Sequence, residues 1–334
     1  MPSPHILLAV LLILALTFDF LNGFHDSANV VATMIASRAM TPRAALGIAA
    51  VSEFSGPLLF GVAVATTIGK EVAPPNALTI PVVFAALLAA SLWNIITWYF
   101  GIPSSSSHAL IGGIMGAVAL GAGIEVIHWE GLTKVFIALF FSPLIGFVVG
   151  WILMRIIFFL ARDATPKANL FFKGAQVPTA LALALSHGAN DSQKTMGIIT
   201  MGLVILGYQK TFHVPLWVIL ASASAISLGT ATGGWRIIHT LGAKFYRIRP
   251  VHGFASQAAS AAVILSASLL GGPVSTTQVV SSSILGVGAA QRRSQVRWGV
   301  MADMLTAWLL TIPLSAALGA GLFWLLSLLP YFQG

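Results

Sequence analysis

The chain has 334 residues, of which 57% are hydrophobic and 8% are charged, and its mean hydropathy is +0.92. A soluble domain averages roughly a quarter charged residues, so the composition excludes a soluble protein and predicts an all-α polytopic membrane protein. The net charge of +8 does not indicate a nucleic-acid partner, because the basic residues lie in short loops between apolar runs, as the positive-inside rule requires. Cysteine is absent, which excludes disulfides and thiolate metal sites.

Ten membrane segments are predicted along the chain. A helix needs about 20 apolar residues to cross a bilayer core, and such runs occur near residues 5–36, 43–66, 79–100, 102–122, 132–160, 176–206, 213–234, 250–270, 273–290 and 299–329. Polar residues or Gly and Pro interrupt the first, fourth, sixth and ninth segments, so these are expected to be broken or re-entrant.

The basic residues predict the orientation of these segments. If every segment crosses and the N-terminus faces out, thirteen Lys and Arg residues lie in inside loops, and three, Lys70, Lys134 and Lys210, lie outside. Because cytoplasmic loops carry the excess of Lys and Arg, both termini are expected outside the cell membrane (plasma or bacterial inner membrane). Residues 235–249 are predicted to form a basic amphipathic connector on the cytoplasmic membrane surface.

Two short motifs each occur twice. Residues 23–27 (Gly-Phe-His-Asp-Ser) match residues 188–192 (Gly-Ala-Asn-Asp-Ser), and residues 103–107 (Pro-Ser-Ser-Ser-Ser) match residues 273–277 (Pro-Val-Ser-Thr-Thr). Each half contains five predicted crossings, an odd number, so the second copy is expected upside down relative to the first. The predicted inverted repeats are residues 1–165 and 166–334. Such repeats with interrupted helices in matching positions indicate a transporter with a site at the bilayer midplane.

The first segment has a polar face. Asp19, Asn22, Asp26, Asn29 and Thr33 recur at helical spacing. Ionisable groups embedded in a membrane cost several kcal/mol, so they face a cavity or a partner and are functional by default. Carboxylate and amide oxygens suit Na⁺, or a carboxylate can carry a proton; the alternative is a stripe that only holds helices together. The helix could also unwind after Asn22, where a glycine follows.

The matching face of the second half contains His187, Asp191 and Lys194, with Lys194 at the position of Asn29. The ammonium could fill the place of a bound cation, hold a substrate anion, or only neutralise Asp191. A lysine at this position favours proton coupling over a full set of sodium sites.

Further ionisable residues lie in other segments. Glu53 has no acidic counterpart in 213–234 and is a candidate proton or cation site. Asp303 could simply pair with Arg297. No role is assigned to the histidines His25, His108 and His187.

Two hydroxyl-rich helix starts follow Pro103 and Pro273. An early proline with hydroxyls at the cap and first turn is typical of a helix N-terminus. The free N–H groups and partial positive charge of such an end can bind an oxyanion without arginine, although a single copy would be an ordinary helix cap. The predicted donors are Ser104, Ser105, Ser106, Ser107, Ser275, Thr276 and Thr277.

These motifs carry a family resemblance. Residues 22–29 (Asn-Gly-Phe-His-Asp-Ser-Ala-Asn) and 188–192 resemble the paired Gly-Ala-Asn-Asp motifs of the inorganic phosphate transporter (PiT) family, and residues 103–108 and 273–277 resemble its phosphate segments. The resemblance extends from about residue 15 to 315. It implies a mostly helical inverted-repeat fold, usually dimeric, in which phosphate enters with Na⁺ or H⁺.

The residues and the resemblance together assign two sites. The phosphate site is predicted from Asp26, Ser104, Ser105, Ser106, Ser107, Asn190, Asp191, Lys194, Ser275, Thr276 and Thr277, and the coupling-ion site from Asn22, Asp26, Asn29, Glu53 and Asp191. Gln193-Lys194 replaces the Ala-Asn of many sodium-coupled members and resembles the bacterial proton-coupled branch, which implies a neutral metal–phosphate complex as a possible substrate. No resident metal or other cofactor is predicted.

The function predicted from the sequence is therefore secondary active import of phosphate, by a homodimer in the bilayer and without enzymatic activity. A sulfate permease of the same architecture is one alternative, but HPO₄²⁻ can donate a hydrogen bond to Asp26 or Asp191, whereas sulfate cannot. An intramembrane hydrolase is another. It is disfavoured because adjacent residues such as Ser107 and His108 lie about 100° apart on a helix. A passive channel fits two interrupted halves less well than alternating access.

Overall fold

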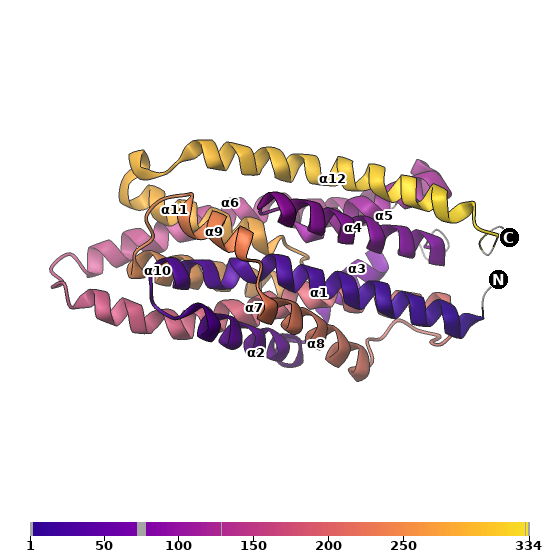
Figure 1. Cartoon of the computed structure of the whole chain (residues 1–334), viewed down its shortest axis with the longest axis horizontal. Coiled ribbons are helices and arrows are strands. Elements are labelled where there is room, and N and C mark those ends of the chain that lie inside the picture. Colours follow the sequence, from indigo (N-terminus) through magenta and orange to yellow (C-terminus); the bar gives the residue numbers. More distant parts are fainter. Residues whose placement is uncertain (1–2, 72–77, 128, 331, 333–334) are drawn as a thin grey trace.

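The computed structural model describes residues 3–71, 78–127, 129–330 and 332. These residues form helices and connecting turns, and they contain no strand. Most helices run along the long axis of the molecule, both termini lie at one end, and the turn between α6 and α7 lies at the opposite end (Figure 1). The α-helices are α1 (Pro4–Ala36), α2 (Pro42–Phe60), α3 (Ala63–Glu71), α4 (Ile80–Phe100), α5 (Ser106–Gly121), α6 (Trp129–Leu160), α7 (Ala168–Ile205), α8 (Leu216–Thr232), α9 (Trp235–Ala243), α10 (Pro250–Leu269), α11 (Thr276–Arg292) and α12 (Trp298–Ser327). Short 3₁₀ turns occur at Ile124–Val126 and Arg293–Gln295.

The apolar helices make this a multi-pass membrane protein. Among the described residues, α1, α4, α6 and α12 are each long and apolar enough to cross a membrane, and the count rises to six if the bent pairs α2–α3 and α8–α9 each form one span. Large apolar side chains on α6 and α12, such as Leu144, Ile145 and Leu309, are exposed, as expected of surfaces that face lipid. The predicted count of ten segments is not established by length and composition alone.

The prediction that the first and sixth segments are broken was wrong. Helix α1 continues for 33 residues and α7 for 38, and each includes its motif glycine. A Cβ atom on Gly23 would overlap the carbonyl group of Ile226 in α8, and one on Gly188 would lie 2.7 Å from Glu53 Cα in α2. These glycines therefore allow close helix contact instead of unwinding the helix.

Helix breaks occur instead within the second and seventh predicted segments. The α2–α3 pair bends by 80° and the α8–α9 pair by 69°. Gly61 (φ 81°) and Gly233 (φ 73°) lie at these bends. A positive φ is strained for residues with a side chain but not for glycine, which explains why the chain turns there.

The fourth and ninth segments begin with non-helical stretches, as their Gly and Pro residues predict. Helix α4 ends at Phe100, Gly101 (φ 66°) follows it, and α5 begins only at Ser106. In the same way, Gly271 (φ 74°) precedes α11, which begins at Thr276. The 16 residues of α5 extend about 24 Å, which is less than the roughly 30 Å of a bilayer core. Helix α5 alone is therefore too short to cross the core, and the burial of Ser105, Ser106 and Ser107 places its start inside the protein.

Each of these short helices packs closely against a long helix. Helix α5 packs against α12, and α11 packs against α6. Added Cβ atoms at Gly116 of α5 and Gly286 of α11 would lie 2.6 Å from Ala316 C and 2.9 Å from Phe147 C, respectively. Small residues thus let both short helices approach their neighbours closely. Two further pairs of helices pack against each other, α8 with α1 and α2 with α7.

Candidate functional site

The starts of α5 and α11 meet inside the protein. Ser107 Oγ, in the first turn of α5, donates to the carbonyl oxygen of Val274, just before α11 (3.1 Å). Ser105 and Ser275 are the N-caps, and their hydroxyl oxygens accept from the backbone N–H groups of His108 (3.2 Å) and Gln278 (3.4 Å). The two predicted helix starts therefore share one buried region.

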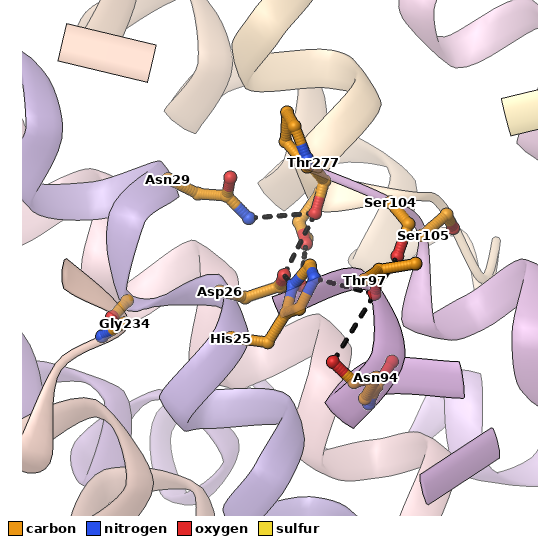
Figure 2. Close-up of polar contacts among 12 residues, drawn as sticks. His25, Asp26, Asn29, Asn94, Thr97, Ser104, Ser105, Gly234 and Thr277 are labelled. Atoms are coloured by element: carbon orange, nitrogen blue, oxygen red, sulfur yellow. Dashed lines mark hydrogen bonds and ion pairs between the residues drawn. The ribbon is translucent and has the colours of Figure 1, made fainter. Parts of the chain in front are cut away.

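Asp26 of α1 contacts the start of α11 directly. Thr277 Oγ1 donates to Asp26 Oδ1 (3.0 Å) and accepts from Asn29 Nδ2 (3.0 Å), as Figure 2 shows. His25 Nδ1 lies 2.7 Å from Asp26 Oδ1. Three predicted site residues, Asp26, Asn29 and Thr277, thus form one hydrogen-bonded group between α1 and α11.

Asp191 of α7 is the carboxylate in the second copy of the motif that contains Asp26. Lys194 Nζ donates to Asp191 Oδ1, to Ser107 Oγ (2.5 Å) and to the carbonyl oxygen of Val274 (3.2 Å). Thr276 Oγ1 donates to Asp191 Oδ2 (2.8 Å) and lies 3.5 Å from Asp26 Oδ2. Thr276 thus lies between the motif carboxylates of the two halves, and Lys194 joins Asp191 to both helix starts.

His187 connects these carboxylates to Glu53. Its Nδ1 atom lies 3.1 Å from Glu53 Oε1, and its Nε2 atom lies 3.1 Å from Asp191 Oδ2 and 3.9 Å from Asp26 Oδ2. Thr230 Oγ1 of α8 donates to Glu53 Oε2 (2.5 Å). These side chains are buried, so each charge depends on the others for stabilisation.

A metal ion could be held within the same cluster. No metal ligand is predicted from the sequence, whereas Asp26, His187 and Asp191 offer ligand atoms that all lie within 4.8 Å of one another. Carboxylate oxygen and imidazole nitrogen are suitable ligands for divalent cations. The sequence indicated a role for His187 only by placing it on the same helical face as Asp191. No sequence pattern indicated a role for Thr230.

The other predicted phosphate residues lie around this centre. Ser104 Oγ donates to Thr97 Oγ1 (2.8 Å), which lies 3.2 Å from His25 Nε2; the contact between Thr97 and His25 is drawn in Figure 2. Asn190 Nδ2 donates to Ser268 Oγ (2.9 Å) and to the carbonyl oxygen of Gly272 (3.2 Å). Ser106 is buried in the first turn of α5. Ser104 and Asn190 therefore hold the helix ends.

Two acidic residues of the sequence analysis lie apart from these contacts. Asp19 and the predicted coupling-ion residue Asn22 are buried, and within the described residues neither side chain forms a hydrogen bond to the cluster around Asp26 and Asp191. Asp303 is exposed on α12. Within residues 129–330 no ion pair joins Asp303 to Arg297, so the structure does not show the pairing that the sequence left open.

The apolar bundle and its buried ionic centre define a polytopic membrane transport protein, not an enzyme. The chain belongs to the phosphate transporter family, whose sequence model matches residues 22–319. It is 46% identical over 328 residues to a probable low-affinity inorganic phosphate transporter of Bacillus subtilis (97% of this chain, 98% of the relative). It is also 46% identical over 316 residues to a protein of the same description from Rhizobium meliloti (94% and 95%).

A solved structure agrees with this assignment. The structure, described as "The sodium-dependent phosphate transporter", superposes with a TM-score of 0.88 at 27% identity, over 97% of this chain and 99% of the other. The family resemblance found in the sequence is thereby confirmed, and neither a sulfate permease nor a hydrolase is favoured.

Proposed function

We propose that this protein imports inorganic phosphate by secondary active transport coupled to protons. The observation that supports this most directly is Thr276, which lies between Asp26 of one half and Asp191 of the other at the start of α11. Phosphate oxygens can accept from the hydroxyls and N–H groups of the two helix starts, and the P–OH group of HPO₄²⁻ can donate to either carboxylate.

The proposed architecture is that of two inverted repeats, residues 1–165 and 166–334, with ten crossings. The paired packing of α5 with α12 and α11 with α6 supports it, as does the location of both termini at one end of the molecule (Figure 1). With the basic loops inside, both termini face out of a plasma or inner membrane. The proposed assembly is a homodimer, as the family resemblance implies.

Lys194 supports proton coupling. Its ammonium contacts three oxygen atoms, from Asp191, Ser107 and the Val274 backbone, and such a set of oxygens is what a hard cation binds. The ammonium is covalently tethered and therefore cannot leave with the substrate. The structural relative is described as sodium-dependent; in this chain we place the mobile positive charge on protons.

The charge balance of the cluster supports the same conclusion. Asp26, Asp191 and Glu53 supply three negative charges and Lys194 one positive charge, with His187 in contact with all three carboxylates. Because uncompensated charge is costly in a buried site, a phosphate anion requires accompanying positive charge. Protons can supply it, and so can the cation of a metal–phosphate complex held near the possible metal ligands described above. The proposed coupling-ion residues remain Asn22, Asp26, Asn29, Glu53 and Asp191.

The test is uptake of radiolabelled phosphate by the purified protein in liposomes, with pH and Na⁺ gradients imposed separately. We expect an inwardly directed proton gradient to drive accumulation without Na⁺. Accumulation that requires Na⁺ and ignores the pH gradient would contradict proton coupling, and sulfate uptake unaffected by excess phosphate would contradict the substrate.

Lys194→Asn tests the role assigned to the ammonium. It introduces the amide that the first half has at Asn29 and leaves the oxygens of Asp191 and Ser107 without the ammonium. We expect uptake in this variant to become Na⁺-stimulated, whereas Lys167→Asn, an exposed control, behaves as the parent. If Lys194→Asn transports as fast as the parent and stays indifferent to Na⁺, the tethered-cation hypothesis fails.

A further inference from the structure

A large basic pocket lies away from the central site. It has a volume of about 1180 Å³, and Arg38, His239, Arg247, Arg249 and Arg297 are among its lining residues. The pocket is bounded by the end of α1, by α9 and the chain that follows it, by the start of α10, and by Pro166 and Asn169 beside the α6–α7 turn. Figure 1 shows this turn at the end of the molecule opposite both termini.

The positive charge of this pocket has no carboxylate partner among the residues that the structure describes. Its lining contains four arginines and no aspartate or glutamate. In the described ranges, from residue 3 to 330 apart from 72–77 and 128, no carboxylate forms an ion pair with any of these arginines. Guanidinium groups bind phosphate oxygens through paired N–H donors, so the pocket has the chemistry of an anion site.

Arg38 stands at a position where the backbone favours glycine. Its φ is 58°, and it is the one residue other than glycine with a positive φ in the described part of the chain. The N–H groups of Arg38 and Ala39 donate to the carbonyl oxygens of Ile35 (3.1 Å) and Met34 (2.9 Å), which is the bond pattern of a Schellman cap. A left-handed conformation is sterically unfavourable for an L-residue that has a Cβ atom. Such strain is found at functional sites, which points to a role for the Arg38 side chain.

A polar track along α1 connects the central site to this pocket. Thr33 and Ser37 continue the helical face of Asp26 and Asn29. Thr33 Oγ1 accepts from Gln257 Nε2 (2.9 Å), and Ser37 Oγ donates to Gln176 Oε1 (2.9 Å). These glutamines of α10 and α7 form a polar layer between the centre and the pocket.

The opposite direction along α1 is apolar. Beyond Asp19, the buried positions are Ala15 and Leu11, which belong to an apolar cluster that also contains Leu87 of α4. With the repeat offsets of 165 and 170 residues, Leu11 and Leu87 are the counterparts of Gln176 and Gln257. Since a charged anion is costly to transfer into apolar surroundings, the glutamine side is the more favourable direction for its release.

We infer that the basic pocket is a second anion site, which binds a phosphate group on the membrane face opposite the termini. One ligand that this pocket could bind is phosphate released from the central site through the Gln176 and Gln257 layer. This part of the inference rests on the proposed function. The other source of the same chemistry is the headgroup of an anionic phospholipid. The arginines are exposed, so binding is weak and sensitive to salt.

The absence of native cysteine allows a direct test that needs no transport. Asn169→Cys introduces a thiol into the pocket lining, and Thr165→Cys introduces a control thiol on the same connection outside it. The full-length protein, in phosphatidylcholine vesicles, is labelled with a negatively charged thiosulfonate reagent. Phosphate at twice its dissociation constant is expected to slow labelling of the pocket thiol about threefold and to leave the control thiol unaffected. Chloride at matched ionic strength is the screening control.

Substitution of arginine then identifies the anion donors. Arg38→Gly relieves the backbone strain while it removes the guanidinium, so we expect a stably folded protein without phosphate protection. Arg247→Gln is a second pocket variant with the same expectation, and Arg162→Gln, at an exposed arginine that pairs with Asp163, should retain protection. Protection that survives both pocket substitutions would overturn the inference.

A change of lipid composition distinguishes free phosphate from a phospholipid headgroup as the ligand. If vesicles that contain phosphatidylglycerol protect the pocket thiol and free phosphate does not, the phosphate group comes from lipid. If neither protects, or if chloride protects as well as phosphate does, there is no anion site. Failure of phosphate uptake in the transport assay would leave these labelling results unchanged, so the two proposals can fail independently.

Discussion

Replacement of the motif glycine Gly23 by alanine should destabilise the protein through the contact between α1 and α8. The added Cβ would overlap the carbonyl oxygen of Ile226 and lie 2.9 Å from its carbonyl carbon, whereas ordinary contacts lie at 3.4–4 Å. The two helices would have to separate by about 1 Å, because protein interiors are close-packed. Overpacking of this kind costs about 1–3 kcal/mol.

The separation would also disturb the buried glutamate. Thr230 Oγ1 of α8 lies 3.1 Å from the carbonyl oxygen of Gly23 and 2.5 Å from Glu53 Oε2, so its single hydrogen is shared between these two acceptors. Weakening a hydrogen bond costs about 1 kcal/mol for a neutral acceptor and about 1.5–3 kcal/mol for a charged one. Because the Thr230 hydroxyl has one hydrogen, the two hydrogen-bond costs do not add, and overpacking plus the bond to the charged acceptor gives about 2.5–6 kcal/mol. This is a large part of the 5–15 kcal/mol that stabilises a typical fold.

The assay is the fraction of detergent-solubilised protein that remains monodisperse after heating, together with phosphate uptake in liposomes. Gly47→Ala is the matched control. Outside its own helix, no atom of the described residues lies within 4 Å of the added Cβ, and alanine is favoured over glycine in a helix by about 1 kcal/mol. We expect Gly23→Ala to aggregate at a clearly lower temperature and to lose uptake, and Gly47→Ala to match or exceed the parent. Equal heat resistance of the two variants would refute the close α1–α8 contact.

Three further substitutions test the site. Asp191→Asn leaves the buried ammonium without its carboxylate, at a cost of about 3–5 kcal/mol; we expect accumulation of phosphate against its gradient to disappear, and an unchanged accumulation ratio would remove this residue from the mechanism. Thr230→Val removes a bond to a buried carboxylate and should reduce uptake at least about tenfold, whereas Thr232→Val, which loses only a bond within its own helix, should not; equal initial rates would argue against this role. Trp308→Phe removes the hydrogen bond from Nε1 to the carbonyl oxygen of Pro103 (2.9 Å). It should raise the KM for phosphate several-fold with little change in expression. An unaltered KM would mean that this bond does not position the start of α5.

Several residues that meet at the buried centre could be singled out from short sequence patterns. Helical spacing placed Asp26 and Asn29 on one face of the first segment, and a proline followed by hydroxyl residues indicated the starts of two helices. Each pattern is local, because it depends on neighbours three or four residues apart on one helix. The N-caps Ser105 and Ser275 agree with it.

Other features depended on which backbones approach each other. Gly23 suggested unwinding of the first segment, and the sixth segment was expected to be broken. Both helices continue, because α8 and α2 pack against Gly23 and Gly188. The bends at Gly61 and Gly233 were missed, since an isolated glycine does not by itself reveal its φ angle. His187 was left without a role because its partner Glu53 belongs to another helix.

The sequence by itself determined that the chain is a helical membrane protein, which family it belongs to, and which polar residues lie within its apolar segments. Composition, periodicity and motifs are sufficient for these conclusions because they are properties of single segments. Only the tertiary structure decided which of these residues meet. Thr277 and Asp26 lie 251 residues apart in the chain, and their contact depends on the packing of α1 against α11, which no local pattern encodes.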